Sequence, residues 1–286
     1  MKLKKRTILA GVVMALMVGT LAYEVGEISS GVSNSKQVNN PKQTEVQEQV
    51  DSKQSDEDAV NQYKNLDKYN STQLNSANST PKRRYDKVAY ITIDDGPSEY
   101  TDKMVQILKD NGVNATFFMV NGNMEEYPNQ VKNALNNGNS IGFHSVSHDI
   151  HKLYKTVNTP KEEFDTCAQT YKRITGQKSK LIRIPFGSKP YTPQRSMDIL
   201  ADSGYKVWDW TLDSEDWKST SEQLLANIKK YTGGSEIVLL IHERKQTVAV
   251  LDDIIKYLKS EGYEILPIQQ DQQEENYWNG KLGTQN

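Results

Sequence analysis

The fold is indicated first by residues 88–98, which read VAYITIDDGPS. Residues 88–94 are mostly apolar and include β-branched and aromatic side chains, a composition typical of a β-strand. An Asp-Gly-Pro turn signal follows at once and ends the strand. The stretch therefore predicts a strand whose carboxyl end carries two adjacent carboxylates, Asp94 and Asp95.

Similar strand patterns alternate with helical patterns along the rest of the chain. The other strand candidates are residues 115–120, 140–145, 181–185, 206–212, 236–242 and 263–268. The helical patterns lie at 101–112, 160–176, 193–204, 221–233 and 248–262, and each ends in a glycine that suits a left-handed C-cap. Strands that alternate with helices form parallel sheets, either doubly wound or closed as a barrel. About seven such units favour an α/β fold of the (β/α) barrel type, with one unit fewer than the usual eight.

Three segments outside this region have compositions that do not suit a packed domain. Residues 1–23 place basic residues before an apolar run, which predicts a signal peptide or an uncleaved membrane anchor. Residues 24–80 are rich in Asn, Gln, Ser and charged residues and predict a disordered polar linker. Residues 271–286 are expected to form a polar tail, which leaves a domain at 81–270. We expect this domain on the extracellular face of the cell membrane or in the cell wall, or secreted if the signal is cleaved.

The composition excludes several classes of partner and site. The 286 residues carry 35 Lys and Arg against 37 Asp and Glu, a net charge of −2, which argues against nucleic acid as a partner. The single cysteine, Cys167, excludes an internal disulfide framework and a multi-thiolate metal site. Any metal must therefore be bound by His, Asp or Glu. We expect a monomer, associated with the membrane through its N-terminal segment if that segment is not cleaved.

Polar and aromatic side chains follow the predicted strands at their carboxyl ends. They are Asp94, Asp95, His144, His148, Arg183, Asp213, Asp216, Trp217 and His242. Parallel strands bring their carboxyl ends to one face, where the active sites of barrels are built. We therefore expect these residues, which include three of the four histidines, to converge.

Taken singly, each of these features has a structural explanation. The Asp-Gly-Pro sequence is a common turn, and His144 and His148 could lie on the surface. Arg183 could form an ion pair at the edge of the core, and His242 could be a buried core histidine. Only their joint placement at one end of the strands favours an active site.

Five of these segments resemble a known family. The segments are ITIDDGPS (91–98), HSVSH (144–148), RIPFGS (183–188), DSEDW (213–217) and LLIH (239–242). Their order and spacing are similar to the motifs of the polysaccharide deacetylases, the NodB-like family-four carbohydrate esterases, among which are peptidoglycan N-acetylglucosamine deacetylases. The resemblance covers residues 85–268. It implies a distorted barrel of about seven strands and hydrolysis of acetyl groups on polysaccharides.

Three positions depart from the usual motifs. Ile93 stands where Phe is usual, Phe143 where Asn often precedes the first histidine, and Glu243 where Asp often follows the last one. None of them removes a group that the chemistry needs. We expect each to lie at the rim of the site, where it would influence the choice of substrate.

The resemblance implies a metal site. Asp95, His144 and His148 offer one carboxylate and two imidazoles, which leaves coordination positions open for water and substrate. We expect one divalent metal, Zn²⁺ in the first place, with Co²⁺, Mn²⁺, Ni²⁺ or Fe²⁺ as alternatives. The same three ligands also occur in iron(II) oxygenases, so that class remains an alternative.

The resemblance also implies roles for the remaining residues. Asp94 would act as the general base, with Arg183 as its ion-pair partner. His242 would protonate the departing sugar nitrogen, and Asp216 would orient it. The family's oxyanion donor corresponds to the backbone N–H of Phe186. The acetyl pocket would be walled by Trp217 and Leu240.

We therefore expect a metal-dependent hydrolase that removes N-acetyl groups from a polysaccharide of the cell envelope. Peptidoglycan N-acetylglucosamine is our first choice, because a tethered domain facing outward fits modification of the cell's own wall. Exopolysaccharide, chitin oligomers and acetylxylan are alternative substrates. A wall-binding domain with a decayed site is the alternative that involves no catalysis.

Overall fold

The computed structural model describes residues 85–279. The predicted signal or anchor segment at 1–23 and the predicted linker at 24–80 lie outside these residues. Among residues 85–279, no helix combines the length and the apolar character that crossing a membrane requires.

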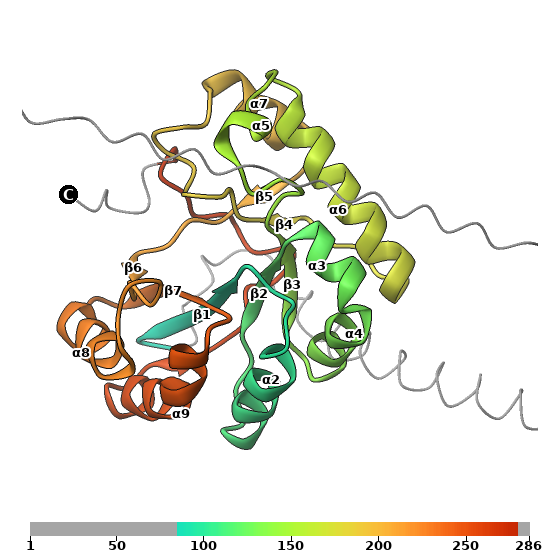
Figure 1. Ribbon diagram of the computed structural model, residues 1–286. Helices are drawn as coiled ribbons and strands as arrows, with labels where there is room; N and C mark the ends of the chain where they lie inside the picture. The colour runs from blue at the N-terminus through green and yellow to red at the C-terminus, as the bar shows by residue number, and fades with distance from the viewer. Residues whose placement is uncertain (1–84, 280–286) are drawn as a thin grey trace, which may run out of the picture. The chain divides into compact units, whose positions relative to one another are not determined.

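Parallel strands form one curled sheet (Figure 1). They are β1 (Val88–Asp94), β2 (Thr116–Met119), β3 (Ser140–Phe143), β4 (Leu181–Ile182), β5 (Lys206–Val207), β6 (Leu212–Asp213), β7 (Glu236–His242) and β8 (Glu264–Ile265). Their order is β5-β4-β3-β2-β1-β7-β6, and β8 pairs with the first two residues of β1. Within residues 85–279 the outer strands β5 and β6 do not pair with each other, so the sheet is a half-barrel. The predicted α/β fold with a distorted barrel is confirmed in this open form.

Helices pack in a row along the outside of the curled sheet (Figure 1). They are α2 (Thr101–Asp110), α3 (Asn121–Glu126), α4 (Pro128–Asn136), α5 (Ile150–Leu153), α6 (Thr159–Thr175), α7 (Gln194–Asp202), α8 (Ser221–Tyr231) and α9 (Lys245–Ser260). Neighbours in the row follow the order α8, α9, α2, α4, α6, α7. The five predicted helices appear as α2, α6, α7, α8 and α9, and α4 ends just before Gly138, which was also predicted to end a helix. The short helices α3 and α5 were not predicted. After α8 the left-handed residue is Gly234 (φ 76°), one position later than the predicted Gly233.

The alternation of side chains along β1 separates two hydrophobic clusters. Ala89, Ile91 and Ile93 belong to the large cluster between the sheet and the helices. Val88 and Tyr90 belong to a smaller cluster inside the half-barrel, which also contains Phe118, Trp208 and Val238. Successive side chains of a strand point to opposite faces, so the even-numbered positions of β1 face inward. Asp94 therefore ends β1 on the inner face, above an apolar floor.

The predicted strand 206–212 is wrong in its length, because it is divided into β5 and β6. The chain turns at Asp209, whose buried carboxylate accepts hydrogen bonds from the backbone N–H of Ser188 and of Tyr277, both at 2.8 Å. Arg183 donates to the carbonyl oxygens of Trp208 and Asp209, each at 2.9 Å. These partners come from distant segments, so a local pattern of apolar residues does not show the break.

The predicted polar tail at 271–286 is also corrected, because residues 271–279 pack on the domain. β5 lies at the edge of the sheet, and the Val207 N–H donates to the carboxylate of Glu274 at 2.9 Å. Asn276 is buried and donates to the carbonyl oxygen of Val207 at 3.2 Å, and the Trp278 indole donates to Ser188 at 2.9 Å. Polar side chains of this segment form hydrogen bonds with the open edge of β5. The segment therefore has the polar composition of a tail although it is packed on the domain.

Candidate active site

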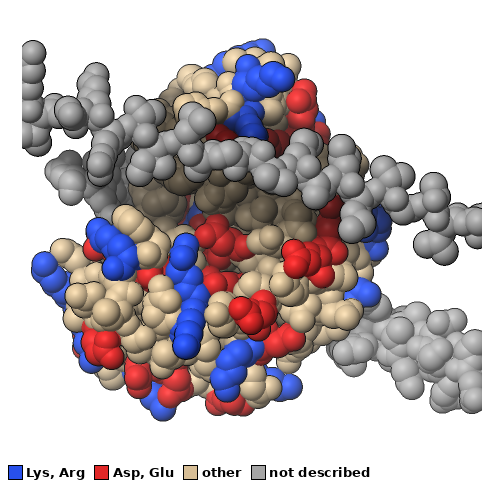
Figure 2. Space-filling model, in the orientation of Figure 1, with Lys and Arg blue, Asp and Glu red and all other residues tan. Residues whose placement is uncertain are grey.

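A cavity of about 570 Å³ lies at the carboxyl ends of the strands. Figure 2 shows acidic side chains gathered in the hollow at the middle of this face. Eight of the ten residues predicted for the site line the cavity, namely Asp94, Asp95, His144, His148, Phe186, Trp217, Leu240 and His242. The other two, Arg183 and Asp216, are fully buried. The structure therefore brings together all the residues that the sequence singled out.

The cavity forms because two neighbouring strands carry their polar residues in register. Asp94 in β1 and His242 in β7 are paired positions of the parallel ladder, and Thr92 is paired with Leu240. All four positions are even-numbered, like Val238, whose side chain belongs to the smaller cluster inside the half-barrel. Their side chains therefore stand together on the inside of the half-barrel.

Asp95, His144 and His148 form the one group of His, Cys, Asp or Glu side chains within residues 85–279 that could bind a metal. The Asp95 Oδ1 atom lies 3.2 Å from His148 Nε2 and 3.7 Å from His144 Nε2, and the three ligand atoms lie within 4.8 Å of one another. The Nδ1 atom of His144 is hydrogen-bonded at 2.8 Å to the carbonyl oxygen of Arg183. This contact fixes the ring and leaves Nε2 available as a ligand. The donor set fits a divalent metal with open positions.

Three residues of the cavity have left-handed backbone conformations, which direct their side chains. Asp95, His148 and Phe186 have φ angles of 71°, 46° and 66°, a region that costs a non-glycine residue about 1–3 kcal/mol. In a regular strand Asp94 and Asp95 would point to opposite faces. The left-handed turn at Asp95 lets both carboxylates enter the same cavity.

The buried Asp94 and Arg183 form an ion pair behind the metal ligands. The Asp94 Oδ1 atom accepts from the Arg183 guanidinium at 3.0 Å, and its Oδ2 atom lies 3.6 Å from His144 Nε2. Arg183 also donates to Thr92 Oγ1 at 2.6 Å and stacks on the Phe118 ring at 4.4 Å. Arg183 therefore holds one carboxylate oxygen of Asp94 and leaves the other facing the cavity.

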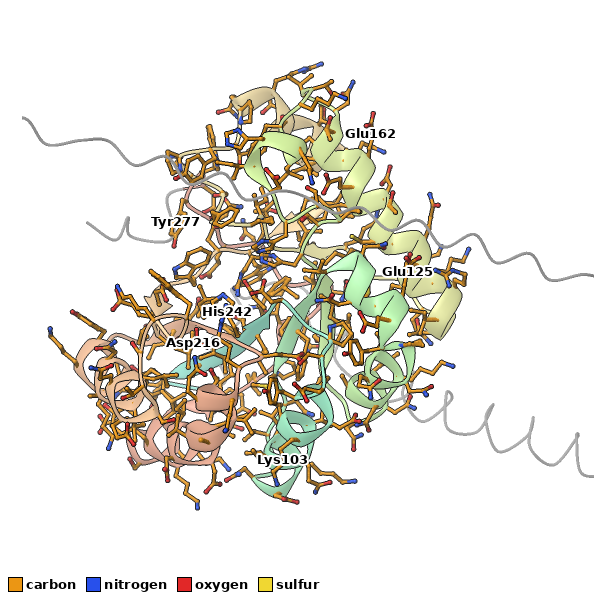
Figure 3. All side chains as sticks on the ribbon, viewed as in Figure 1. Lys103, Glu125, Glu162, Asp216, His242 and Tyr277 are labelled. Carbon is orange, nitrogen blue, oxygen red and sulfur yellow. The ribbon has the colours of Figure 1, made fainter. Side chains whose placement is uncertain are left out.

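Asp216 holds His242 at two points (Figure 3). Its Oδ1 atom lies 2.6 Å from His242 Nδ1, and its Oδ2 atom accepts from the backbone N–H of His242 at 2.7 Å. Thr247 Oγ1 also donates to Oδ2, at 2.6 Å. The imidazole is thus oriented with Nε2 left for the cavity.

Burial and charge set the protonation of these groups. Burial lowers the pKa of His144, which favours the neutral imidazole that a metal requires. Burial alone would raise the pKa of Asp95, but the hydrogen bond with His148 and the charges of nearby imidazoles bring it well below its usual range. Burial alone would lower the pKa of His242, but the hydrogen bond and charge of Asp216 outweigh it and raise that pKa. His242 therefore retains its proton to higher pH than an ordinary histidine.

Comparison with known proteins identifies the family. The family model of the polysaccharide deacetylases matches residues 82–208. A peptidoglycan-N-acetylglucosamine deacetylase of Bacillus cereus is 38% identical over 189 residues, which cover 62% of this chain and 68% of that protein. The chain belongs to the polysaccharide deacetylase family.

Solved structures of deacetylases share this fold. The polysaccharide deacetylase Bc1974 from Bacillus cereus superimposes with a TM-score of 0.65 and 34% identity, covering 67% of this chain and 97% of that one. The catalytic domain of a peptidoglycan N-acetylglucosamine deacetylase from Eubacterium rectale gives a TM-score of 0.64 and 25% identity, covering 70% and 97%. The predicted family and enzyme class are confirmed. The alternatives of an iron(II) oxygenase and of a wall-binding domain without activity are not supported.

The predicted oxyanion donor and pocket walls of the deacetylase lie around the metal ligands. Within residues 85–279 the backbone N–H of Phe186 donates to no protein acceptor, and its ring lies 5.1 Å from that of His148. Trp217 is 57% exposed at the rim, and Leu240 is buried on the cavity wall. Leu240 and Trp217 therefore leave an apolar surface beside His242.

Four residues that line the cavity were not predicted as site residues, namely Pro190, Tyr191, Trp210 and Arg244. Tyr191 is half exposed and lies beside Phe186, and Arg244 lies two positions after His242. Tyr191 belongs to an irregular loop with no pattern that could have singled it out. Arg244 lies two positions after the last motif, and this short distance from His242 was the available signal.

The three departures from the family motifs were predicted to lie at the rim of the site. This prediction is wrong, because none of them lies there. Ile93 and Phe143 are fully buried in the core, and Glu243 is 8% exposed. The Glu243 carboxylate accepts from Ser98 Oγ at 2.5 Å and from Thr101 Oγ1 at 2.6 Å. Each side chain points away from the cavity, so these departures do not shape the substrate surface of the deacetylase.

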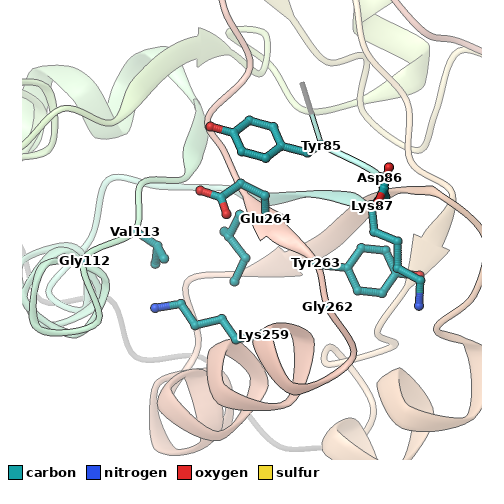
Figure 4. Close-up of a pocket in the computed structure, with 10 residues that line it drawn as sticks. Tyr85, Asp86, Lys87, Gly112, Val113, Lys259, Gly262, Tyr263 and Glu264 are labelled. Carbon is teal, nitrogen blue, oxygen red and sulfur yellow. The ribbon is translucent and has the colours of Figure 1, made fainter. Parts of the chain in front are cut away.

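A second cavity of about 610 Å³ lies at the opposite end of the sheet (Figure 4). It is lined by Lys87 at the start of β1, by Lys259 at the end of α9 and by Tyr263 and Glu264 beside them. Its lining contains no histidine or cysteine. The amino ends of the strands in such folds serve stability rather than catalysis. The cavity at the carboxyl ends therefore remains the candidate active site.

Proposed function

We propose that this deacetylase removes N-acetyl groups from peptidoglycan N-acetylglucosamine by metal-dependent hydrolysis. The observation that carries the proposal is the presence of three units in one cavity: the Asp95, His144 and His148 cluster, the Asp94–Arg183 pair and the His242–Asp216 pair. The substrate is supported by the names of the relatives from Bacillus cereus and Eubacterium rectale, both peptidoglycan N-acetylglucosamine deacetylases.

Asp95, His144 and His148 would hold the metal, for which Zn²⁺ is the first candidate and Co²⁺, Mn²⁺, Ni²⁺ and Fe²⁺ are alternatives. When bound, such an ion lowers the pKa of a water molecule and polarises a carbonyl oxygen. The hydrogen bond from His144 Nδ1 to Arg183 keeps its Nε2 directed at this position.

Asp94 accepts the proton of the attacking water in this proposal. Its Oδ2 atom faces the metal ligands, while Arg183 holds Oδ1 at 3.0 Å and balances the negative charge. The backbone N–H of Phe186, which has no acceptor among the described residues, donates to the oxygen that becomes negative as the acetyl carbonyl is attacked.

His242 donates a proton from Nε2 to the sugar nitrogen as the C–N bond breaks. Its raised pKa extends the protonated form to higher pH than in an ordinary histidine, and Asp216 fixes its direction. An amine is a poor leaving group without a proton. This acid therefore suits an N-acetyl substrate.

We also propose that the enzyme acts as a monomer on the outer side of the cell, held at the membrane or in the wall, or secreted. The sequence of residues 1–23 and 24–80 supports this location through its basic and apolar segment and its polar linker. Peptidoglycan is a polymer on that side of the membrane.

The experiment is acetate release by the full chain from peptidoglycan, exopolysaccharide, chitin oligomers and acetylxylan. We expect the highest kcat/KM on peptidoglycan, loss of activity after chelation and its return with Zn²⁺. A higher kcat/KM on another of the four glycans would show that this glycan, and not peptidoglycan, is the preferred substrate. Full turnover after exhaustive chelation would refute the metal-dependent mechanism.

A further inference from the structure

Arg244 is the only lysine or arginine among the described residues that line the catalytic cavity. It precedes α9 and is tied to the active site through its backbone. Its N–H donates to the carbonyl oxygen of His242 at 2.9 Å, and its own carbonyl oxygen accepts from Val248 at 3.0 Å. The base of the side chain therefore keeps a fixed position relative to the proposed acid His242.

The guanidinium of Arg244 has no acceptor among residues 85–279. Its Nε–H is buried without a hydrogen-bond partner, and the ion pairs of this region do not include it. A buried donor without an acceptor destabilises the state that contains it. No described protein group therefore competes with a ligand oxygen for the guanidinium of Arg244.

The nearby acidic groups are engaged with other partners. Asp94 is paired with Arg183 at 3.0 Å, and Asp216 is paired with His242 at 2.6 Å. Asp95 lies 3.2 Å from His148, and Asp213, which also lines the cavity, accepts from the backbone N–H of Glu215 at 2.8 Å. Arg244 thus remains the one permanent cation that the cavity presents to a ligand.

We propose that Arg244 binds a carboxylate on the sugar unit next to the one that is deacetylated, so that the enzyme selects an acidic acetylated glycan. This inference rests on the proposed function. His242 marks the side of the cavity where the sugar leaves, and Arg244 is held beside it. A guanidinium binds a carboxylate through two parallel hydrogen bonds, which gives direction as well as charge. In peptidoglycan the sugar next to N-acetylglucosamine carries a lactyl carboxyl group, which is a free carboxylate where no peptide is attached, whereas chitin has no such group.

The test compares two substrates that differ only in this charge. The full chain is assayed with Zn²⁺ on a peptidoglycan tetrasaccharide with free lactyl carboxylates and on the same tetrasaccharide with these groups as methyl esters. We expect the wild type to show a KM about tenfold lower for the acid, the effect of one charge-assisted hydrogen bond. Arg244→Gln should remove this preference through KM, and Arg244→Lys should retain part of it.

Lys245→Gln is the matched control, because Lys245 is the exposed neighbour and loses the same charge without lining the cavity. It should keep the preference. An equal rise of KM for the acid and the ester in Arg244→Gln, or the same loss in Lys245→Gln, would overturn the assignment.

Binding separates this inference from the proposed function. Calorimetry in an Asp94→Asn background measures the affinity for both tetrasaccharides without turnover. If the wild type releases acetate from neither, the proposed substrate is wrong. Equal affinity for acid and ester in this background would refute the role of Arg244 on its own.

Discussion

Two adjacent carboxylates have different surroundings and hence different chemistry. Asp94 is buried against Arg183 and touches the metal ligands with one oxygen only, whereas Asp95 is partly exposed and faces both histidines. The difference arises from a single left-handed φ angle of 71° at Asp95. At the residue scale, the backbone therefore separates the proposed base Asp94 from the proposed metal ligand Asp95.

Asp94→Asn should keep the metal and lose activity by about 10²- to 10⁴-fold, because it removes a base and not a ligand. Asp95→Asn should lower the affinity for the metal, since an amide is a weaker ligand than a carboxylate. Metal content after dialysis and acetate release measure the two effects. Asp110→Asn, on the exposed side of α2, is the control. Equal metal loss in both variants would reverse the assigned roles.

Asp216 should set the alkaline limit of activity. A general acid works only while protonated, so kcat/KM falls as pH rises through the pKa of His242, which is raised by Asp216. Asp216→Asn removes the charge that stabilises the imidazolium, and the alkaline limb should move to lower pH. Profiles of kcat/KM against pH on an N-acetylated glycan measure the shift. A limb that stays in place or moves to higher pH contradicts the role of His242 as the acid.

At the scale of elements, a residue that follows β7 forms hydrogen bonds with the loop that follows β1. Glu243 directly follows β7 and binds Ser98 and Thr101, which hold the turn after Asp95. Gly96 allows this contact, because a Cβ atom there would lie 1.9 Å from Glu243 Oε1. The loop that carries a metal ligand is thus fixed by a side chain from the neighbouring strand.

Gly96→Ala should destabilise the enzyme by about 1–3 kcal/mol, because the added methyl group displaces the Glu243 carboxylate from its hydrogen bonds. Gly122→Ala is the matched control, since nothing lies within 4 Å of a Cβ atom at that position of α3. Denaturant unfolding measures both. The double variant Gly96→Ala, Glu243→Ala should lose less than the sum of the single variants. Strict additivity would show that the two residues do not interact in this way.

At the scale of the whole domain, residues 274–278 pack along β5 at one edge of the half-barrel. They satisfy β5 at the edge of the sheet and contact Ser188, which follows the loop of Phe186. A closed barrel would need no such segment, because it has no edges. The C-terminal segment therefore contributes to the same domain as the active site.

Asn276→Ala should lower the free energy of unfolding by about 1–3 kcal/mol, because it leaves the carbonyl oxygen of Val207 and two backbone N–H groups without their partner. Asn129→Ala, at an exposed position of α4, should change it little. Thermal or urea unfolding of the full chain compares them. A disordered tail would instead make the two variants equal.

Local sequence patterns were enough to predict the parallel α/β fold and the candidate residues of the site. The apolar run of β1, the turn after Asp94 and the histidines after β3 are local patterns, and parallel strands bring such ends to one face. For the same reason the sequence was enough to predict Asp95, His144 and His148 as metal ligands.

Tertiary contacts account for the division of strand 206–212 at Asp209, the packing of the segment around Asn276 and the burial of Glu243. They also leave the guanidinium of Arg244 without an acceptor among residues 85–279. Each depends on whether a polar group finds a hydrogen-bond partner far away in the chain. Burial makes that partner obligatory, and no local pattern records where it comes from.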